Sequence, residues 1–178
     1  SSSWTISAAT VSGNSAPLGG GGLSVAMSGN VSLTRVTLDN NTAINGAGGG
    51  LLVSHASGGA FTTTTNVTLY GNTAGTGGGG AATTAGTLSL VNTTVAGNTS
   101  TNGAGGLSHG GGEITTFNTL VASNTGTAGN CAGTVKSTGY SLDTGTSCGF
   151  SSTGDKSSAN AALGPFGANG GTTRTVPI

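Results

Sequence analysis

The chain has 178 residues, only 4% of them charged, and four Lys or Arg residues balance four Asp or Glu residues. A chain without a basic stripe has little to offer phosphates, so the composition argues against nucleic acid as a partner and against an anionic lipid patch. The same neutrality leaves little charge repulsion to oppose self-association. No apolar run reaches the roughly 18 residues of a membrane helix, so we expect no membrane span.

Glycine accounts for 37 residues, and Ser, Thr and Asn fill much of the rest. A disordered chain is one interpretation of so polar a composition, but disordered segments also carry high net charge and abundant Pro, Glu and Lys. This chain holds three Pro and no excess charge. Its glycines also recur at fixed places, so we expect an ordered repeat protein.

Five segments repeat one pattern, in which two short apolar runs are followed by a turn that contains asparagine. They cover residues 4–15, 31–42, 61–73, 88–99 and 114–125. The marker residues of the turns are Asn14, Asn41, Asn72, Asn98 and Asn124. These markers recur at intervals of about 26 to 31 residues, and glycine runs follow four of them.

Apolar residues alternate with Ser or Thr inside each segment, as in 31–33, 67–69 and 88–90. This period of two predicts short half-buried strands, and no run has the 3.6-residue period of a helix. Such short strands cannot bury a face alone, whereas stacked repeats can. A repeat of this length suits one coil of about three strands and three turns, so the sequence predicts a solenoid of parallel sheets.

Asparagine and glycine have distinct physical uses in such a coil. Asparagine tolerates left-handed backbone, and identical asparagines stacked between coils can form amide ladders, so we expect the five markers to form a structural ladder. Glycine runs permit positive φ and close backbone approach at corners. Flexible linkers are the alternative for the glycine runs, but linkers would not recur in register with the markers.

The regular repeat stops near residue 130. We expect residues 1–130 to form regular coils and residues 131–178 an irregular C-terminal coil or cap, within one continuous domain. Cys131 and Cys148 fit no CxxC metal or redox spacing, and an even pair in a secreted chain predicts a disulfide. That bond would contribute about 3 kcal/mol by restricting the unfolded chain. Two free buried thiols are the alternative.

The groups that could support catalysis are scattered along the chain. The acids are Asp39, Glu113, Asp143 and Asp155, which fall at unrelated phases of the repeat and predict no carboxylate pair. Arg35 and Asp39 are expected to form a surface ion pair. His55 and His109 are expected at exposed or corner positions, too far apart to share a metal. We therefore expect no catalytic residue, no cofactor, no metal site and no enzymatic activity.

The motifs of the repeat resemble those of a known group of proteins. They include Val-Thr-Leu at 36–38 and 67–69, Gly-Asn-Thr-Ala at 71–74 and four glycines at 77–80. With the C-terminal Cys-Gly-Phe at 148–150, they are similar to bacterial secreted right-handed parallel β-helix repeat proteins, the polymorphic-outer-membrane-type and autotransporter-like surface proteins. The resemblance spans nearly all of residues 4–175. It implies a right-handed, single-stranded parallel β-helix of about five to six coils, secretion to the cell surface and no catalytic residues.

Three non-enzymatic functions remain open. The first is an extracellular structural subunit that assembles end to end with itself or with a parent surface protein, as in a filament. In that case a neighbouring copy would contact apolar residues near one end of the chain, either Trp4 and Ile6 or Val176 and Ile178. Few charged side chains lie near either end to oppose strand pairing.

The second function is an adhesin or glycan-binding module, although Trp4, Tyr70 and Tyr140 do not repeat at one phase. The third is ice binding, which needs threonine at the same two positions of every coil. The threonine clusters at 62–65, 83–84 and 115–116 are expected to be out of register with one another.

Overall fold

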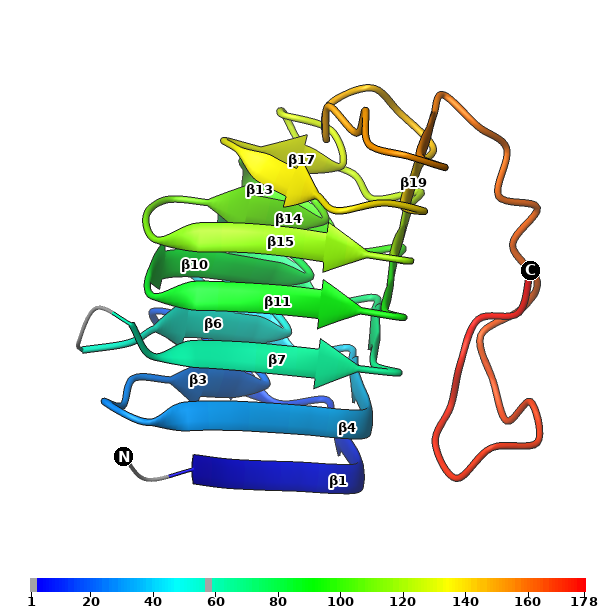
Figure 1. Cartoon of the computed structure of the whole chain (residues 1–178). Coiled ribbons are helices and arrows are strands. Elements are labelled where there is room, and N and C mark those ends of the chain that lie inside the picture. The colour runs from blue at the N-terminus through cyan, green and yellow to red at the C-terminus, as the bar shows by residue number, and fades with distance from the viewer. Residues whose placement is uncertain (1–2, 57–58) are drawn as a thin grey trace.

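The alternating segments form short strands, and the strands stack coil over coil along one axis (Figure 1). The computed structural model describes residues 3–56 and 59–178, so positions 1–2 and 57–58 of the predicted regular region lie outside the described part. Within that part no helix occurs, and none could therefore cross a membrane. The all-β parallel solenoid, of about five turns, is confirmed, while its right hand stays a prediction.

The strands belong to three parallel sheets. Sheet A contains β1 (Ser3–Ser12), β4 (Asn30–Asp39), β7 (Phe61–Thr65), β8 (Thr68–Tyr70), β11 (Thr87–Val91), β12 (Thr94–Ala96), β15 (Glu113–Phe117), β16 (Leu120–Ala122), β18 (Val135–Ser137), β19 (Leu142–Asp143) and β20 (Lys156–Ser157). Sheet B contains β2 (Ser15–Ala16), β5 (Thr42–Ala43), β9 (Thr73–Thr76) and β13 (Thr99–Asn102). Sheet C contains β3 (Leu23–Val25), β6 (Leu51–Ser54), β10 (Ala81–Ala85), β14 (Leu107–His109) and β17 (Cys131–Ala132).

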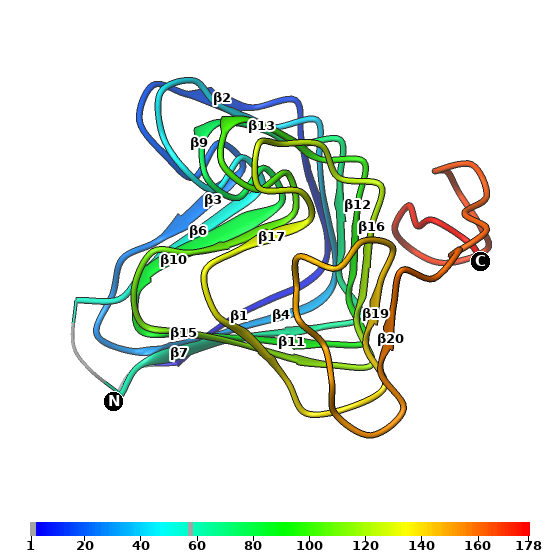
Figure 2. The ribbon, with the colours of Figure 1, turned by 90° about the horizontal axis from the view of Figure 1, so that it is seen from above.

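Successive coils pass through these sheets in the same order, so they superpose when the solenoid is viewed along its axis (Figure 2). Sheet A bends and has two arms. The first arm consists of residues 3–7, residues 30–34 and strands β7, β11, β15 and β18. The second arm consists of residues 9–12, residues 36–39 and strands β8, β12, β16, β19 and β20.

One residue per coil makes the bend between the two arms with left-handed backbone. The residues of this column, with φ between 47° and 55°, are Ala8, Arg35, Asn66, Asn92 and Asn118. Asparagine adopts this conformation at lower cost than most side chains, which explains its recurrence here. None of the five markers is among them, so left-handed bends and the marker turns use two different sets of asparagines.

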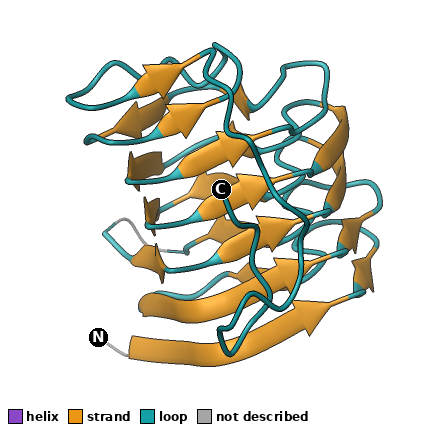
Figure 3. Cartoon of the chain, turned by 90° about the vertical axis from the view of Figure 1, so that its right-hand side faces the viewer, coloured by secondary structure: helices purple, strands orange, loops and turns teal. Residues whose placement is uncertain are grey.

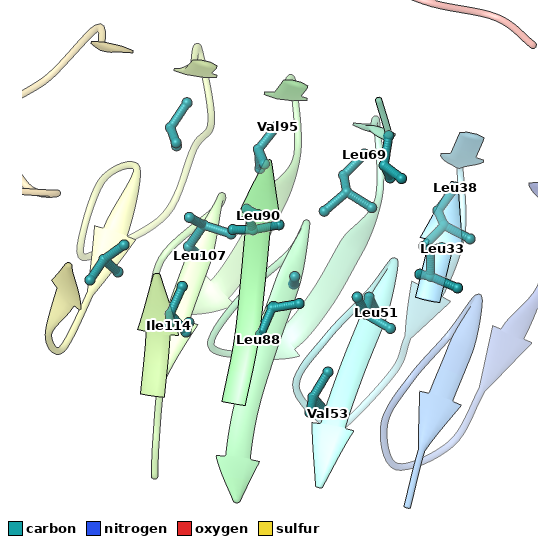
Figure 4. Packing of buried hydrophobic residues seen from close by; sticks show 14 of the residues in the cluster. Leu33, Leu38, Leu51, Val53, Leu69, Leu88, Leu90, Val95, Leu107 and Ile114 are labelled. Carbon is teal, nitrogen blue, oxygen red and sulfur yellow. The ribbon is translucent and has the colours of Figure 1, made fainter. Parts of the chain in front are cut away.

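Inward side chains stack into apolar columns (Figure 4). One column of the second arm consists of Val11, Leu38, Leu69, Val95 and Val121. In the first arm, Thr62 and Thr64 occupy inward positions opposite Leu88 and Leu90, and all four side chains are fully buried. The hydroxyl of Thr64 is 2.9 Å from that of Thr93, which satisfies this buried polar group.

The last part of the chain leaves the coils and runs back along the second arm (Figure 3). Val176 is buried there, and with Ile178 it lines a groove that Leu120 and Leu142 of the second arm share. Val176 and Ile178 therefore lie along the second arm, where Ile178 is 85% exposed, and their docking on a neighbour stays a prediction. Parallel pairing also continues beyond residue 130, through β18, β19 and β20.

The left-handed bend predicts different outcomes for two substitutions at Asn92. Asn92→Val should lower the free energy of unfolding by about 1–2 kcal/mol, because a β-branched side chain adopts positive φ poorly. Asn92→Gly should stay within about 1 kcal/mol of the parent, since glycine keeps the backbone and loses only an exposed 2.9 Å hydrogen bond from Asn118. Urea denaturation measures both, and equal losses would contradict this origin of the bend.

Candidate functional site

The marker asparagines lie one above another and hydrogen-bond from coil to coil, and Asn41, Asn72 and Asn98 in the middle of the column are fully buried. The column consists of Asn14, Asn41, Asn72, Asn98, Asn124 and Asn130. At its centre, the Asn72 side-chain amide donates to Oδ1 of Asn98 and to the Leu38 carbonyl, both at 2.9 Å. The backbone N–H of Asn72 donates to the same Oδ1 at 2.9 Å. The buried amides thus use their hydrogen-bonding groups to join coils, which is a structural role.

A buried carboxylate follows the last asparagine of the column. Asn130 donates to Oδ1 of Asp143 at 2.6 Å, and the backbone N–H groups of Gly145 and Cys148 donate to the same carboxylate at 2.7 and 2.9 Å. Asp143 pairs in register with Val121 and is fully buried, so it takes the place of the next apolar residue. The sequence analysis missed Asn130 because it follows the preceding ladder residue by only 6 positions, outside the repeat interval.

The C-terminal end of the solenoid is closed by residues 144–157, which we call the C-terminal cap. The predicted Cys131–Cys148 disulfide is confirmed and ties this cap to sheet C, while the Phe150 side chain is 7% exposed and belongs to the core. The Ser152 hydroxyl donates to the Ser137 carbonyl of β18 at 2.7 Å. The cap therefore satisfies part of the outer edge of the last coil.

The first described coil differs from the last one. Strand β1 pairs with β4 on one side, and no described strand pairs with its other edge (Figure 1). Trp4 is in register with the buried Val31, so it stands in a core column, yet its side chain is 61% exposed. Beside it lies a groove of about 350 Å³ lined by apolar side chains that include Ile6, Leu23 and Met27. A core column thus ends in exposed apolar surface here.

The outer surface of the first arm carries a column of hydroxyl groups. This hydroxyl column consists of Thr5, Ser32, Thr63, Ser89 and Thr115. The expectation that the 62–65 and 115–116 clusters are out of register is therefore wrong, because both pair with β11 in one register. The neighbouring outer column contains Val91 and Phe117, so the face lacks the two matched threonine columns that ice binding needs.

Two exposed aromatic rings lie at the C-terminal corner of this face. Phe117 and Tyr140 are 41% and 58% exposed, and their ring centroids are 5.9 Å apart in an edge-to-face arrangement. Tyr70, by contrast, stacks against Phe166 of the C-terminal segment at 4.2 Å. The three aromatic residues considered for glycan binding, Trp4, Tyr70 and Tyr140, therefore lie in three different environments.

The predicted surface ion pair between Arg35 and Asp39 is wrong. Asp39 is fully buried and pairs with Arg174 at 2.7 Å, while Arg35 occupies the left-handed bend. Asp39 also accepts hydrogen bonds from the Ser12 hydroxyl at 2.9 Å and the Asn40 amide at 2.8 Å. This cluster fastens the C-terminal segment to the second arm, so the carboxylate is part of a structural contact.

Of the remaining acids, Asp155 accepts from the Ser137 hydroxyl and the Ser141 N–H, both at 2.8 Å, and Glu113 forms an exposed ion pair with Lys136 at 2.7 Å. The structure brings no three His, Cys, Asp or Glu residues of the described ranges together as metal ligands.

The two histidines occupy different positions of the coil. His55 follows the last residue of β6, which is a corner position, but its side chain is only 3% exposed. Its Nδ1 lies 2.9 Å from the Met27 carbonyl and its Nε2 lies 3.0 Å from the Thr62 hydroxyl. Because a carbonyl only accepts, Nδ1 carries the proton. His109 pairs with Thr83, which in turn pairs with Val53 on the coil before it. The Nε2 atom of His109 lies 2.8 Å from the Gly112 carbonyl.

The geometry defines a class, the parallel β-solenoid, here with a cap after its last described coil. No protein-family model, curated protein sequence or solved structure matches this chain. The resemblance of its repeats to bacterial secreted surface proteins therefore stays a prediction beyond the solenoid fold.

Removing an amide from the middle of the asparagine column should cost far more than removing one from its end. Asn98→Ala should lower the free energy of unfolding by about 3 kcal/mol or more, because it removes the acceptor of the buried backbone N–H and side-chain amide of Asn72 and the amide that donates to the Leu69 carbonyl. Asn14→Ala, at the exposed end, should cost less than about 1 kcal/mol. Chemical denaturation compares the two, and similar losses would contradict a cooperative column.

Proposed function

We propose that the protein is an exported, non-enzymatic structural solenoid, a cell-surface or scaffold module whose described N-terminal coil associates end to end with a copy of itself or with a parent surface protein. The observation that carries the proposal is Trp4, which stands in a core column and is nevertheless 61% exposed. An unpaired strand edge backed by apolar side chains is a template for another β-edge.

The contacts of the acidic residues support a structural role. Asp39 holds the C-terminal segment, Asp143 ends the asparagine column, Asp155 organises the cap and Glu113 pairs with a lysine. These four are all the acids of the chain. General acid–base chemistry needs a carboxyl group that is free to exchange protons with a substrate, so these contacts favour a scaffold over a catalyst.

Two further observations support export to the cell surface. The Cys131–Cys148 disulfide is of a kind that persists in oxidising compartments outside the cytosol. The repeats also resemble those of bacterial secreted surface proteins, whose β-helices carry structural and adhesive roles. A neutral surface with few charges suits association with a copy of itself or with a parent surface protein.

Association through the N-terminal end makes Trp4 the residue to change. We expect the unsubstituted protein to associate as its concentration rises. Trp4→Ser should raise the dissociation constant at least about tenfold, because aromatic anchors dominate such interfaces. Tyr140→Ser is the matched control, since Tyr140 is similarly exposed at the opposite end and should leave association unchanged. Sedimentation velocity and light scattering measure the association of the unsubstituted protein and of both variants. An unsubstituted protein that stays monomeric at its highest soluble concentration would contradict the proposal.

The exposed Phe117–Tyr140 pair favours a second candidate function, binding of an uncharged polysaccharide on the first arm. Aromatic rings offer flat faces to sugar rings, and the adjacent hydroxyl column offers donors and acceptors. If this function holds, the fraction of protein bound to an insoluble polysaccharide such as cellulose or chitin should fall about tenfold in Tyr140→Ala. Trp4→Ser should leave that fraction unchanged, and a parent protein that binds no member of a polysaccharide panel would exclude this candidate.

A further inference from the structure

We infer that the groove beside the last bend of the solenoid binds one neutral sugar residue of a polysaccharide. The Tyr140 ring is the surface on which the sugar stacks, and the side-chain amides of Asn92 and Asn118 are its polar contacts. The groove has a volume of about 330 Å³ and lies between the second arm and the C-terminal segment. This inference rests on the second candidate function, because it names the subsite and the class of sugar for the same aromatic corner.

Tyr140 continues the column of left-handed bends by one coil. Leu142 pairs with Leu120, and Tyr140 and Asn118 each precede this pair by two residues, so the tyrosine stands over the asparagine. The φ of Tyr140 is 57°, close to the 47° of Asn118. A bulky side chain adopts this conformation at a higher cost than asparagine does. The chain therefore accepts strain to place a tyrosine at a bend where the preceding coils use asparagine.

The surroundings of Tyr140 hold its ring in place and still leave it 58% exposed. The edge-to-face contact with Phe117 supports the ring, and the Tyr140 N–H donates to the Thr153 carbonyl at 2.9 Å. A Cβ atom at Gly154 would lie 2.5 Å from the ring, so the glycine leaves the room that the ring occupies. Strained residues concentrate at ligand sites, and a ring already fixed in position loses little entropy when a ligand binds.

The two asparagines before Tyr140 in the column have hydrogen-bonding groups to spare. The Asn118 side-chain amide donates to Oδ1 of Asn92 at 2.9 Å, and both residues are exposed. This bond leaves Oδ1 of Asn118 and the side-chain N–H groups of Asn92 without another partner among the described residues. Since successive coils are about 4.8 Å apart, an acceptor and a donor lie within two coils of the ring. Sugar hydroxyl groups both donate and accept, so they match this pair.

The rest of the groove favours a neutral ligand. Its lining contains no charged side chain, so a phosphate or another anion would find no basic partner there. Apolar side chains line it together with the hydroxyl-bearing Thr94, and they are Leu120, Leu142 and Val176. A sugar has apolar C–H faces that stack on an aromatic ring and hydroxyl groups around its rim, so it uses both kinds of lining. The volume is at the lower end of small-ligand pockets, which suits a single sugar residue.

Calorimetric titration with cellotetraose, chitotetraose and mannotetraose tests the groove. At least one of these neutral oligosaccharides should bind the unsubstituted protein. Tyr140→Gly and Asn118→Gly keep the left-handed backbone and remove only the side chains, so each should raise the dissociation constant at least about tenfold. Asn66→Gly is the matched control, because Asn66 lies in the same bend column but outside the groove, and it should leave the dissociation constant unchanged. Circular dichroism checks that each variant is folded.

A variant of the hydroxyl column distinguishes this inference from the function on which it rests. A loss of binding in Ser89→Ala with none in Asn118→Gly would place the sugar on the face of the first arm. That outcome overturns the groove and keeps the second candidate function. Binding of an insoluble polysaccharide without binding of any oligosaccharide has the same meaning. A protein that binds neither kind of probe overturns both the inference and the second candidate function.

Discussion

Successive coils of this protein are joined through the interior by a column of asparagine side chains, each held by the next. Because an amide in this column uses its backbone N–H, its side-chain oxygen and its side-chain nitrogen together, a coil displaced by one residue would leave several buried polar groups unpaired. The column therefore fixes the register of every coil on its neighbour. The apolar columns, the left-handed bends and the outer hydroxyl column all follow from that register.

The same constraint explains why the two ends differ. A stack of strands has unpaired backbone N–H and C=O groups at each end, and the two ends of the described coils differ in how these groups are covered. At the C-terminal end, Asp143 replaces an apolar residue of the core and collects N–H donors, while the disulfide and Phe150 cover what remains. At the N-terminal end, Trp4 and Ile6 continue the core columns and nothing in the described residues covers them. The described coils therefore differ at their two ends.

The few charged side chains of the protein mostly form contacts within it. Most of the few charged groups serve the fold, as the pairs Asp39–Arg174 and Glu113–Lys136 show. The Arg174 guanidinium also lies 4.9 Å over the Phe166 ring, which itself stacks on Tyr70. The C-terminal segment thus covers part of the second arm and leaves the first arm, with its hydroxyl column and the Phe117–Tyr140 pair, exposed.

The sequence by itself determined the repeating part of the protein, because periodic side chains carry local information about period and phase. The alternation of Val31 and Leu33 gave the strands, and the spacing of the five marker asparagines gave the column that the structure contains. The tertiary structure alone decided the features that depend on segments distant in sequence and outside the repeat. Asp39 meets Arg174 across 135 positions, Asn130 joins the column from an irregular loop, and Val176 packs on the second arm rather than at an end. No local pattern specifies such contacts, since they arise only when the coils have stacked and the last segment finds the surface that they leave exposed.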